Sequence, residues 1–428
     1  MHHHDVACRA SGVAGKIHAR YCILTPALVA IALIQSYIYR IKIILPMPFF
    51  LLIFFLLLVG YAVLIGYYHN AWNKLPLYTA PETTPATAIT VIVPARNEEQ
   101  HLPALLQSLR QQQYPAHLLE VIVIDDHSTD STLRILQEAA ITWPQLKVIE
   151  LAKVPLPENA SSAFKKRAIQ AGIDQAGGKL IVTTDADCIF YPRWLHTLAS
   201  FYESNGAKFI AAPVLIKAKH RLLDIFQTID FLTLQGITGA AVFKRIHSMC
   251  NGANLAYEKA AFEEVRGFEQ IDHLPSGDDM FLMHKIYQKY PDKVFYCKSP
   301  EAIVETAPAP SWKAFFHQRI RWASKADSYN DKRIFWALLL VYCSNVGFLI
   351  LFILGFWKPL SFFFLLILLL AKVLIEFPFV NAVAIFFRQQ RWMRYFLVLQ
   401  PLHIVYTIIA GWLGKFGRYE WKGRTVSK

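Results

Sequence analysis

The chain has 428 residues, of which 54% are hydrophobic and only 18% are charged, yet its formal net charge is +13. The hydrophobic content excludes a disordered chain, and a total of 19 glycines excludes a collagen-like one. The positive excess lies at the two ends, because residues 1–46 carry five basic side chains and one acidic, residues 388–428 carry eight and one, and residues 47–387 carry 31 and 29. Since the middle of the chain is nearly neutral, we expect no nucleic-acid partner.

Residues 1–46 contain a first apolar segment, Tyr21–Leu45, which includes Arg40 and Lys42 near its end. These two charges weaken it as a membrane span. Met47 begins a stretch with the composition of a natural N-terminus. We therefore predict that residues 1–46 are either a weak membrane segment or an over-long start.

Residues 47–72 are predicted to form a transmembrane helix. Within them, Phe49–Tyr68 is a run of 20 residues without a formal charge, and a helix of that length spans about 30 Å, the thickness of the hydrocarbon core of a bilayer. The proline-containing residues 73–87 are predicted to be a linker into a soluble domain at residues 88–310.

The soluble domain shows short β-rich runs that alternate with amphipathic helices, a pattern typical of an α/β domain with a largely parallel sheet. In chain order we predict a strand at Ala88–Val93 ended by Pro94, a helix at Glu98–Gln112, a strand at Glu120–Ile124, a helix from Ser131, a helix at Ser162–Ala176 and a strand at Lys179–Thr184. Ligands bind at the carboxyl ends of strands in such sheets, so Asp125 and Asp126 should lie near Asp185 and Asp187.

Asp185 and Asp187 are two positions apart after a strand, a spacing that lets two carboxylates hold one hard cation. Mg²⁺ and Mn²⁺ favour oxygen ligands of this kind and bridge to a diphosphate. We expect Asp187 to reach the cation directly and Asp185 to reach it through water or a ribose hydroxyl. A solvated turn with two acidic residues is the alternative for so short a pattern taken alone.

Residues 311–330 interleave aromatic and basic side chains, which predicts an amphipathic helix at the membrane surface. Residues 331–414 are predicted to be a C-terminal transmembrane region. It contains three apolar segments: Ile334–Trp357, Leu360–Phe387 and Tyr395–Gly414.

Two charged residues interrupt the second of these segments, Lys372 and Glu376, and their i,i+4 spacing predicts an ion pair on one helix face. Basic residues precede and follow the third segment, and both groups favour the cytoplasmic side. We therefore predict that Tyr395–Gly414 does not cross the membrane fully and that residues 415–428 form a basic cytosolic tail.

Several short motifs follow one another in a fixed order. They are VIVPARNEE at Val91–Glu99, VIDDHSTD at Val123–Asp130, a Lys-rich helix start at Lys165, TDAD at Thr184–Asp187, GDDMFL at Gly277–Leu282 and QRIRW at Gln318–Trp322. Together they resemble the family 2 glycosyltransferases, which have the Rossmann-like GT-A fold. The more similar branch is the membrane-embedded one, with cellulose, chitin and hyaluronan synthases and lipid glucosyltransferases. The resemblance covers about residues 88–325.

The resemblance implies a donor site built from residues that follow successive strands. It places Ala95, Asn97, Glu98 and one of Asp125 and Asp126 against the nucleoside, Lys165 or, in the rival register, Lys166 near the nucleotide, and Asp185 and Asp187 at the metal. For the two lysines, the alternative is a solvated basic helix start.

The resemblance also implies the groups that act on the acceptor. Asp279 matches the proposed general base, and Asp278 beside it replaces the more common Glu. Gln318, Arg321 and Trp322 match the Q-x-x-R-W motif, in which Arg321 offsets charge on the leaving diphosphate and Trp322 forms the floor of the acceptor site. Asn251 and Gly252 are similar to a loop that lines this site. Each assignment has an alternative. Asp278 and Asp279 could only cap a helix, the Q-x-x-R-W residues could only belong to a membrane-surface helix, and Asn251 and Gly252 could only form a tight turn.

By resemblance, the chain is therefore an integral cell-membrane glycosyltransferase with a cytosolic α/β catalytic domain. It would transfer a sugar with inversion from a nucleotide-diphosphate donor, expected to be UDP-linked, to a lipid or short-glycan acceptor, with Mg²⁺ or Mn²⁺ as cofactor and membrane lipids as partners. Such an enzyme would serve polysaccharide or glycolipid biosynthesis in the cell envelope. Two alternatives are a processive polysaccharide synthase of the same family and a catalytically silent membrane protein that binds sugar nucleotides.

Overall fold

The computed structural model describes residues 47–154, 163–246, 249–271, 277–324, 331–416, 419–421 and 424–426. The predicted segment at residues 1–46 lies outside the described residues, as do residues 325–330 of the predicted interfacial helix and parts of the predicted tail. The chain divides into two compact units, Met1–Val59 and Gly60–Lys428. In the first unit, the described residues form the beginning of helix α2 (Met47–Lys74), where the rings of Phe50 and Phe54 stack.

A mixed seven-stranded sheet forms the centre of the second unit in its described part, in the order β3-β2-β1-β4-β8-β6-β9. Strands β1 to β4 run parallel, β8 is antiparallel to both of its neighbours, and β6 and β9 are parallel. The strands are β1 (Ile89–Ala95), β2 (Leu119–Asp125), β3 (Leu146–Glu150), β4 (Leu180–Thr183), β6 (Phe209–Ala211), β8 (Leu255–Glu258) and β9 (Val294–Tyr296). The predicted α/β class is confirmed.

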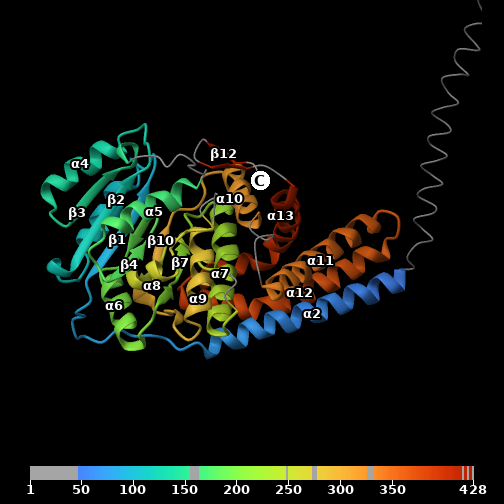
Figure 1. Cartoon of the computed structure of the whole chain (residues 1–428). Helices are drawn as coiled ribbons and strands as arrows, with labels where there is room; N and C mark the ends of the chain where they lie inside the picture. Colours follow the sequence, from blue (N-terminus) through green and yellow to red (C-terminus); the bar gives the residue numbers. More distant parts are fainter. Residues whose placement is uncertain are drawn as a thin grey trace, which may run out of the picture. The chain divides into compact units, whose positions relative to one another are not determined.

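Smaller sheets and helices complete this unit (Figure 1). A three-stranded sheet contains β5 (Cys188–Phe190), β10 (Val304–Thr306) and β7 (Val214–Ile216), and a two-stranded one contains β11 (Tyr419–Trp421) and β12 (Arg424–Val426). The α-helices before the C-terminal region are α3 (Leu102–Arg110), α4 (Thr132–Thr142), α5 (Phe164–Gln175), α6 (Trp194–Asn205), α7 (Leu222–Phe243), α8 (Lys259–Glu264), α9 (Asp278–Lys289) and α10 (Trp312–Ala323).

The central strands are buried on both faces, as parallel strands usually are. Val91 and Val93 belong to a core cluster that also contains residues of α3 and α6. The opposite face packs on α5, where a Cβ at Gly172 would lie 2.9 Å from Ile92 and 3.0 Å from Ile124. Helices on both faces therefore fix the strand ends that carry the site.

Strand β1 continues through Pro94 to Ala95, whereas the sequence predicted that Pro94 ends it. In the parallel ladder, β4 pairs only with Ile89 to Ile92, so no strand requires an N–H from Pro94 on that side. On the other side, Asp126 donates its N–H to the carbonyl of Ala95. Strands β1 and β2 therefore end together.

Gly178, just before β4, packs directly against the backbone of β1. A Cβ there would lie 2.4 Å from the nitrogen of Thr90. We expect Gly178→Ala to destabilise the fold by about 2 kcal/mol or more, because a backbone atom has to move. Gly177→Ala is the matched control, since its Cβ would meet only a Glu120 oxygen at 3.8 Å. Thermal unfolding of the purified variants measures the difference, and equal midpoints would refute it.

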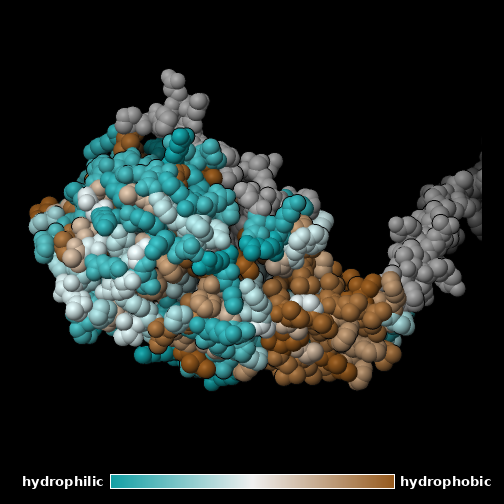
Figure 2. All heavy atoms as spheres, turned by 60° about the horizontal axis from the view of Figure 1, so that its bottom comes forward, coloured by the Kyte–Doolittle hydropathy of each residue, from teal (hydrophilic) through white to brown (hydrophobic). Residues whose placement is uncertain are grey.

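Four helices of the described part are long and apolar enough to cross a membrane: Met47–Lys74, Lys332–Gly355, Leu360–Phe386 and Gln390–Lys415. They correspond to α2, α11 (Lys332–Gly355), α12 (Leu360–Phe386), and the short helix η5 (Gln390–Tyr395) continuing into α13 (Phe396–Phe416). Figure 2 shows a continuous brown surface distinct from the hydrophilic surface of the sheet domain, and α11 and α12 carry many exposed apolar side chains. The predicted pair of Lys372 and Glu376 is present and buried.

Candidate active site

The loops after β1 and β2 are joined by hydrogen bonds. Asn97 has a φ of 52°, a left-handed conformation that asparagine tolerates better than most residues. Its side-chain oxygen accepts from the Thr129 N–H at 2.8 Å, and its own N–H donates to Ser128 Oγ at 3.0 Å. Ala95, the last residue of β1, is buried. Asn97 therefore holds the two loops together at the carboxyl edge of the sheet.

Asp125 is a buried carboxylate with an unsatisfied oxygen. It is 4% exposed, its Oδ2 accepts from the Ser128 N–H at 3.3 Å, and its Oδ1 has no hydrogen-bond partner among the described residues. Asp126 differs, because its Oδ1 lies 2.9 Å from His127 Nδ1. A buried acceptor without a partner is costly, so Asp125 Oδ1 is suited to a donor group of a ligand.

Glu98 is also buried, at 8% exposure, but its polar atoms are engaged. Its N–H donates to Thr132 Oγ1 at 2.8 Å, and its Oε2 lies 2.8 Å from His101 Nδ1. These contacts tie the loop after β1 to the first turns of α3 and α4.

Lys165 brings together residues from three separate elements. Its Nζ, at the start of α5, lies 2.6 Å from Asp185 Oδ1 after β4 and 3.5 Å from Asp278 Oδ2 at the start of α9. Burial lowers the pKa of Lys165, but Asp185 and Asp278 outweigh burial and raise the pKa overall, so the lysine keeps its charge at neutral pH. The rival residue Lys166 is buried and donates to the Ile271 carbonyl instead.

The loop around Gly252 closes this cluster. The Gly252 N–H donates to Asp279 Oδ2 at 3.2 Å. A Cβ on Gly252 would lie 3.2 Å from Lys165 Nζ and 3.4 Å from Asp278 Oδ2, so a side chain here would press on both charged groups. Asn251 forms the turn itself, because its side-chain oxygen accepts from the Ala253 N–H at 3.0 Å.

Asp278 and Asp279 occupy the first turn of α9, after Gly277 with its φ of 84°. The positive end of the helix dipole stabilises their negative charge. Asp279 Oδ1 accepts from the Met280 N–H at 2.8 Å, which is a local contact of the capping kind. Its Oδ2, however, contacts Gly252, so Asp279 also belongs to the cluster around Lys165.

Asp187 directly precedes β5 and contacts Thr306, the last residue of β10. Its Oδ2 accepts from Thr306 Oγ1 at 3.1 Å. Asp185 keeps its side chain 37% exposed. Within the described ranges, no group of three or more His, Cys, Asp and Glu side chains is placed to hold a metal ion. The two aspartates offer hard oxygen atoms, the kind of ligand that Mg²⁺ and Mn²⁺ favour.

The Q-x-x-R-W residues lie on α10, and no hydrogen bond or ion pair between described residues joins them to the Lys165 cluster. Gln318 and Arg321 are half-buried, and Gln318 Oε1 accepts from Arg319 Nη1 at 3.2 Å. Trp322 packs against the domain core and lies 5.9 Å from the Phe231 ring. Arg319, for which the sequence pattern predicts no role of its own, is buried.

Family models match most of this architecture. The model of "Glycosyl transferase family group 2" matches residues 180–416, which is more than half of the chain. That of "Glycosyl transferase family 2" matches residues 90–266. The chain belongs to glycosyl transferase family group 2.

Three known proteins are similar to this chain over different shares of its length. "Probable glycosyltransferase YdaM" of Bacillus subtilis is 25% identical over 55% of this chain and 54% of its own length. "4,4'-Diaponeurosporenoate glycosyltransferase" of Staphylococcus aureus is 30% identical over 37% of this chain and 39% of its own. The chain thus spans about half or less of these two curated relatives. The solved "Mannosyltransferase PcManGT" of Pyrobaculum calidifontis, in complex with GDP-Man and Mn²⁺, has a TM-score of 0.54 and 21% identity over 83% of this chain and 98% of that one.

The likeness to the mannosyltransferase structure shows the fold and confirms the GT-A prediction for this family group 2 chain. The more specific branch, with polysaccharide synthases and lipid glucosyltransferases, stays a prediction. Of the residues that the resemblance selected, Lys165, Asp185, Asp278, Asp279 and Gly252 meet in space.

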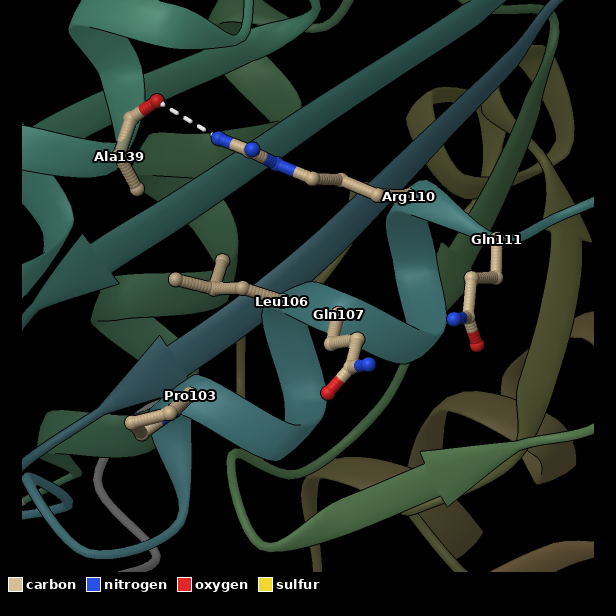
Figure 3. A pocket seen from close by; sticks show the side chains of 6 residues that line it. All are labelled: Pro103, Leu106, Gln107, Arg110, Gln111 and Ala139. Atoms are coloured by element: carbon tan, nitrogen blue, oxygen red, sulfur yellow. Dashed lines mark hydrogen bonds between the residues drawn. The ribbon is translucent and has the colours of Figure 1, made fainter.

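A pocket of about 410 Å³ lies elsewhere in this family member, on α3 and α4. Figure 3 shows Arg110 reaching across it to the carbonyl of Ala139, at 3.1 Å. It is lined by Pro103, Leu106, Gln107, Arg110, Gln111 and Ala139. Because none of the residues selected from the family motifs lines it, this pocket has no part in the candidate site.

Proposed function

We propose that the protein is an integral membrane inverting glycosyltransferase, which moves a sugar from a nucleotide-diphosphate donor, UDP-linked by preference, to a lipid or short-glycan acceptor. One observation carries the proposal. Lys165 contacts Asp185 and Asp278, while the adjacent Gly252 N–H binds Asp279. A cation for the donor and a carboxylate for the acceptor thus lie side by side at the edge of the sheet.

The donor would bind along the carboxyl ends of β1, β2 and β4. Asp125 Oδ1, which lacks a partner among the described residues, would accept from the uracil imide or a ribose hydroxyl. Asn97 and Glu98 hold the surrounding loops in place through their backbone and side-chain contacts. Lys165 would offset part of the diphosphate charge, and Arg321 the charge that develops on the leaving group.

Asp185 and Asp187 would hold a divalent cation, Mg²⁺ or Mn²⁺, together with oxygens of the donor. Such an ion neutralises negative charge on a diphosphate. Two features support the assignment: the donor set consists of hard oxygens, and the solved structure with the same fold contains GDP-Man and Mn²⁺. Thr306 would keep Asp187 oriented through its hydroxyl, while Lys165 fixes one oxygen of Asp185.

Asp279 would act as the general base. It would take the proton from the acceptor hydroxyl as that oxygen forms a bond to the anomeric carbon, on the face opposite the breaking bond to the diphosphate. The Gly252 N–H at 3.2 Å from Oδ2 would keep the carboxylate aimed at the acceptor. Trp322 on α10 would supply the floor under the acceptor.

The catalytic domain would lie on the cytosolic side of the cell membrane. The three arginines around η5, Arg388, Arg391 and Arg394, are exposed where α13 begins. At its other end, α13 meets α10, since a Cβ at Gly414 would lie 2.6 Å from the Ala323 Cβ. At the first end, the Trp392 ring of η5 lies 5.4 Å from the ring of His220, just before α7. Both ends of α13 thus lie near the sheet domain, which supports the proposal that this helix does not cross fully.

Purified membranes that carry the protein test the proposal when nucleotide sugars are screened against total lipid extract. We expect one donor to give a labelled lipid or short-glycan product whose formation needs a divalent cation. Sizing of the radiolabelled product separates single transfer from processive synthesis. Tight donor binding without a product from any acceptor would contradict the proposed activity and favour a silent sugar-nucleotide-binding protein.

A further inference from the structure

Arg319, the second residue of the QRIRW segment, forms a buried ion pair with Asp230 of α7. Their side chains are 3% and 2% exposed, and Nη2 lies 2.7 Å from Oδ2. Because taking two charges out of water is expensive, a buried pair stabilises a fold little more than well-packed apolar residues would. The effect of this pair that we consider is therefore the orientation of α10.

Arg319 contacts two of the three motif residues directly. Its Nη1 donates to Gln318 Oε1 at 3.2 Å, and its guanidinium lies 4.2 Å from the centre of the Trp322 ring. The guanidinium also lies 4.7 Å from the centre of the Phe315 ring. The guanidinium is therefore held among aromatic rings on its own helix, in direct contact with Gln318 and Trp322.

Helix α13 completes this arrangement. The Tyr406 hydroxyl donates to Asp230 Oδ1, and the Tyr406 ring packs against Phe226 and Phe315 at 5.5 and 5.4 Å. His403 Nε2 lies 3.8 Å from the same Asp230 oxygen. Asp230 thus contacts residues of both α10 and α13.

The same face of α13 reaches the apolar helices. Gln400 precedes His403 by three residues, and Tyr406 follows it by three, a spacing that lines up side chains on a helix. Lys372 Nζ donates to Gln400 Oε1 at 2.9 Å, and Gln400 Nε2 donates to Glu376 Oε2 at 2.6 Å. One polar stripe on α13 therefore connects the buried pair in α12 with the pair that holds α10.

We propose that Arg319 is a positioning residue: with Asp230 and the Tyr406 hydroxyl, it fixes α10 so that Gln318, Arg321 and Trp322 face the donor and acceptor. This inference rests on the proposed glycosyl transfer for its kinetic readout. It assigns to α13 the task of setting the orientation of the motif helix from the membrane region.

Tyr406→Phe is the mildest test, because it removes one hydroxyl and keeps the ring packing. We expect kcat to fall about tenfold, with the donor KM within twofold of the wild type, since a hydrogen bond to a buried charge is lost. Thr238→Val is the matched control: the Thr238 hydroxyl on α7 donates to the Leu234 carbonyl of its own helix at 2.9 Å, and its loss should leave kcat unchanged. An unchanged kcat in Tyr406→Phe would overturn the proposal.

Asp230→Asn and the double variant Asp230→Asn/Arg319→Gln separate positioning from stability. The single variant leaves a buried charge unpaired, so both the amount of folded protein and kcat should fall. In the double variant the charge is gone, and the amount of folded protein and the thermal midpoint should recover while kcat stays at least tenfold low. If kcat per folded molecule recovers with the thermal midpoint, Arg319 is only structural and the proposal is wrong.

A labelling experiment tests the orientation of α10 without measuring enzyme turnover. In a Gln318→Cys background, Tyr406→Phe should change the maleimide labelling rate of that cysteine at least threefold, followed by mass spectrometry of its peptide. Equal labelling rates with and without Tyr406→Phe would overturn the proposal. If the wild type yields no product with any donor, the proposed function fails, and the labelling rates alone decide the inference.

Discussion

Asp279→Asn should lower kcat by about two to four orders of magnitude, the range that general-base catalysis contributes. Asparagine keeps an oxygen that can accept from the Gly252 N–H, which lies 3.2 Å from Asp279 Oδ2 in the wild type. It cannot take a proton from the acceptor hydroxyl. Donor affinity should therefore stay within about threefold of the wild type while turnover collapses. Single-turnover kinetics together with isothermal titration of the donor separate these two quantities.

Asp292→Asn is the control for this variant. Asp292 is an exposed aspartate whose ion pair joins it to Arg245, 2.6 Å away on the surface, and its loss should leave kcat unchanged. Asp278→Asn provides the contrast within the site. Since Asp278 faces Lys165 at 3.5 Å, its substitution should act mainly on the donor KM. Wild-type kcat in Asp279→Asn would exclude this residue as the base.

The sequence predicted the candidate site best at strands whose order along the chain indicates which strands are neighbours in the sheet. Asp125 is the last residue of β2 and Asp185 follows β4, and these strands are the two neighbours of β1, so the rule that strand ends carry ligands places both at one edge. The sequence left Asp125 and Asp126 equivalent as nucleoside contacts. Burial and hydrogen bonding distinguish them, because only Asp125 keeps an oxygen without a partner among the described residues.

Contacts between distant elements escaped prediction for a physical reason. Arg319 appears in the sequence as one more cation of an amphipathic helix, and the partner that makes it special, Asp230, lies on α7, 89 positions earlier. No local pattern of charge or hydropathy encodes that pairing. The ion pair of Lys372 and Glu376, in contrast, was predictable, because the two residues are four positions apart on one helix.

The Pro94 error has a similar origin. Proline within a central strand normally argues against that strand, because it removes a ladder hydrogen bond. Here β4 stops pairing at Ile92, so the position of Pro94 faces no strand on the side where its N–H is missing. The relative lengths of neighbouring strands decide the outcome, and they are not readable from either strand alone.

Asp187→Ala should lower kcat/KM by roughly two to four orders of magnitude, since several kcal/mol of charge neutralisation at the diphosphate would be lost with the cation. Alanine removes both oxygens of a side chain that the Thr306 hydroxyl orients from 3.1 Å. The effect should be accompanied by loss of Mn²⁺ binding in the presence of the nucleoside diphosphate. Electron paramagnetic resonance of Mn²⁺ titrated into the protein measures that binding without any turnover.

Thr306→Val isolates the orienting contact from the carboxylate itself. It keeps both Asp187 oxygens and removes only the hydroxyl, so Mn²⁺ affinity should fall by about tenfold and partly recover at high Mn²⁺ concentration, as expected for a group that orients a metal ligand. Asp187→Ala should not recover at any Mn²⁺ concentration. Two results together would contradict this proposal: wild-type turnover that survives chelation, and wild-type turnover in Asp187→Ala. The two aspartates would then hold no cation, and Lys165 and Arg321 would be the groups that balance the charge of the leaving diphosphate.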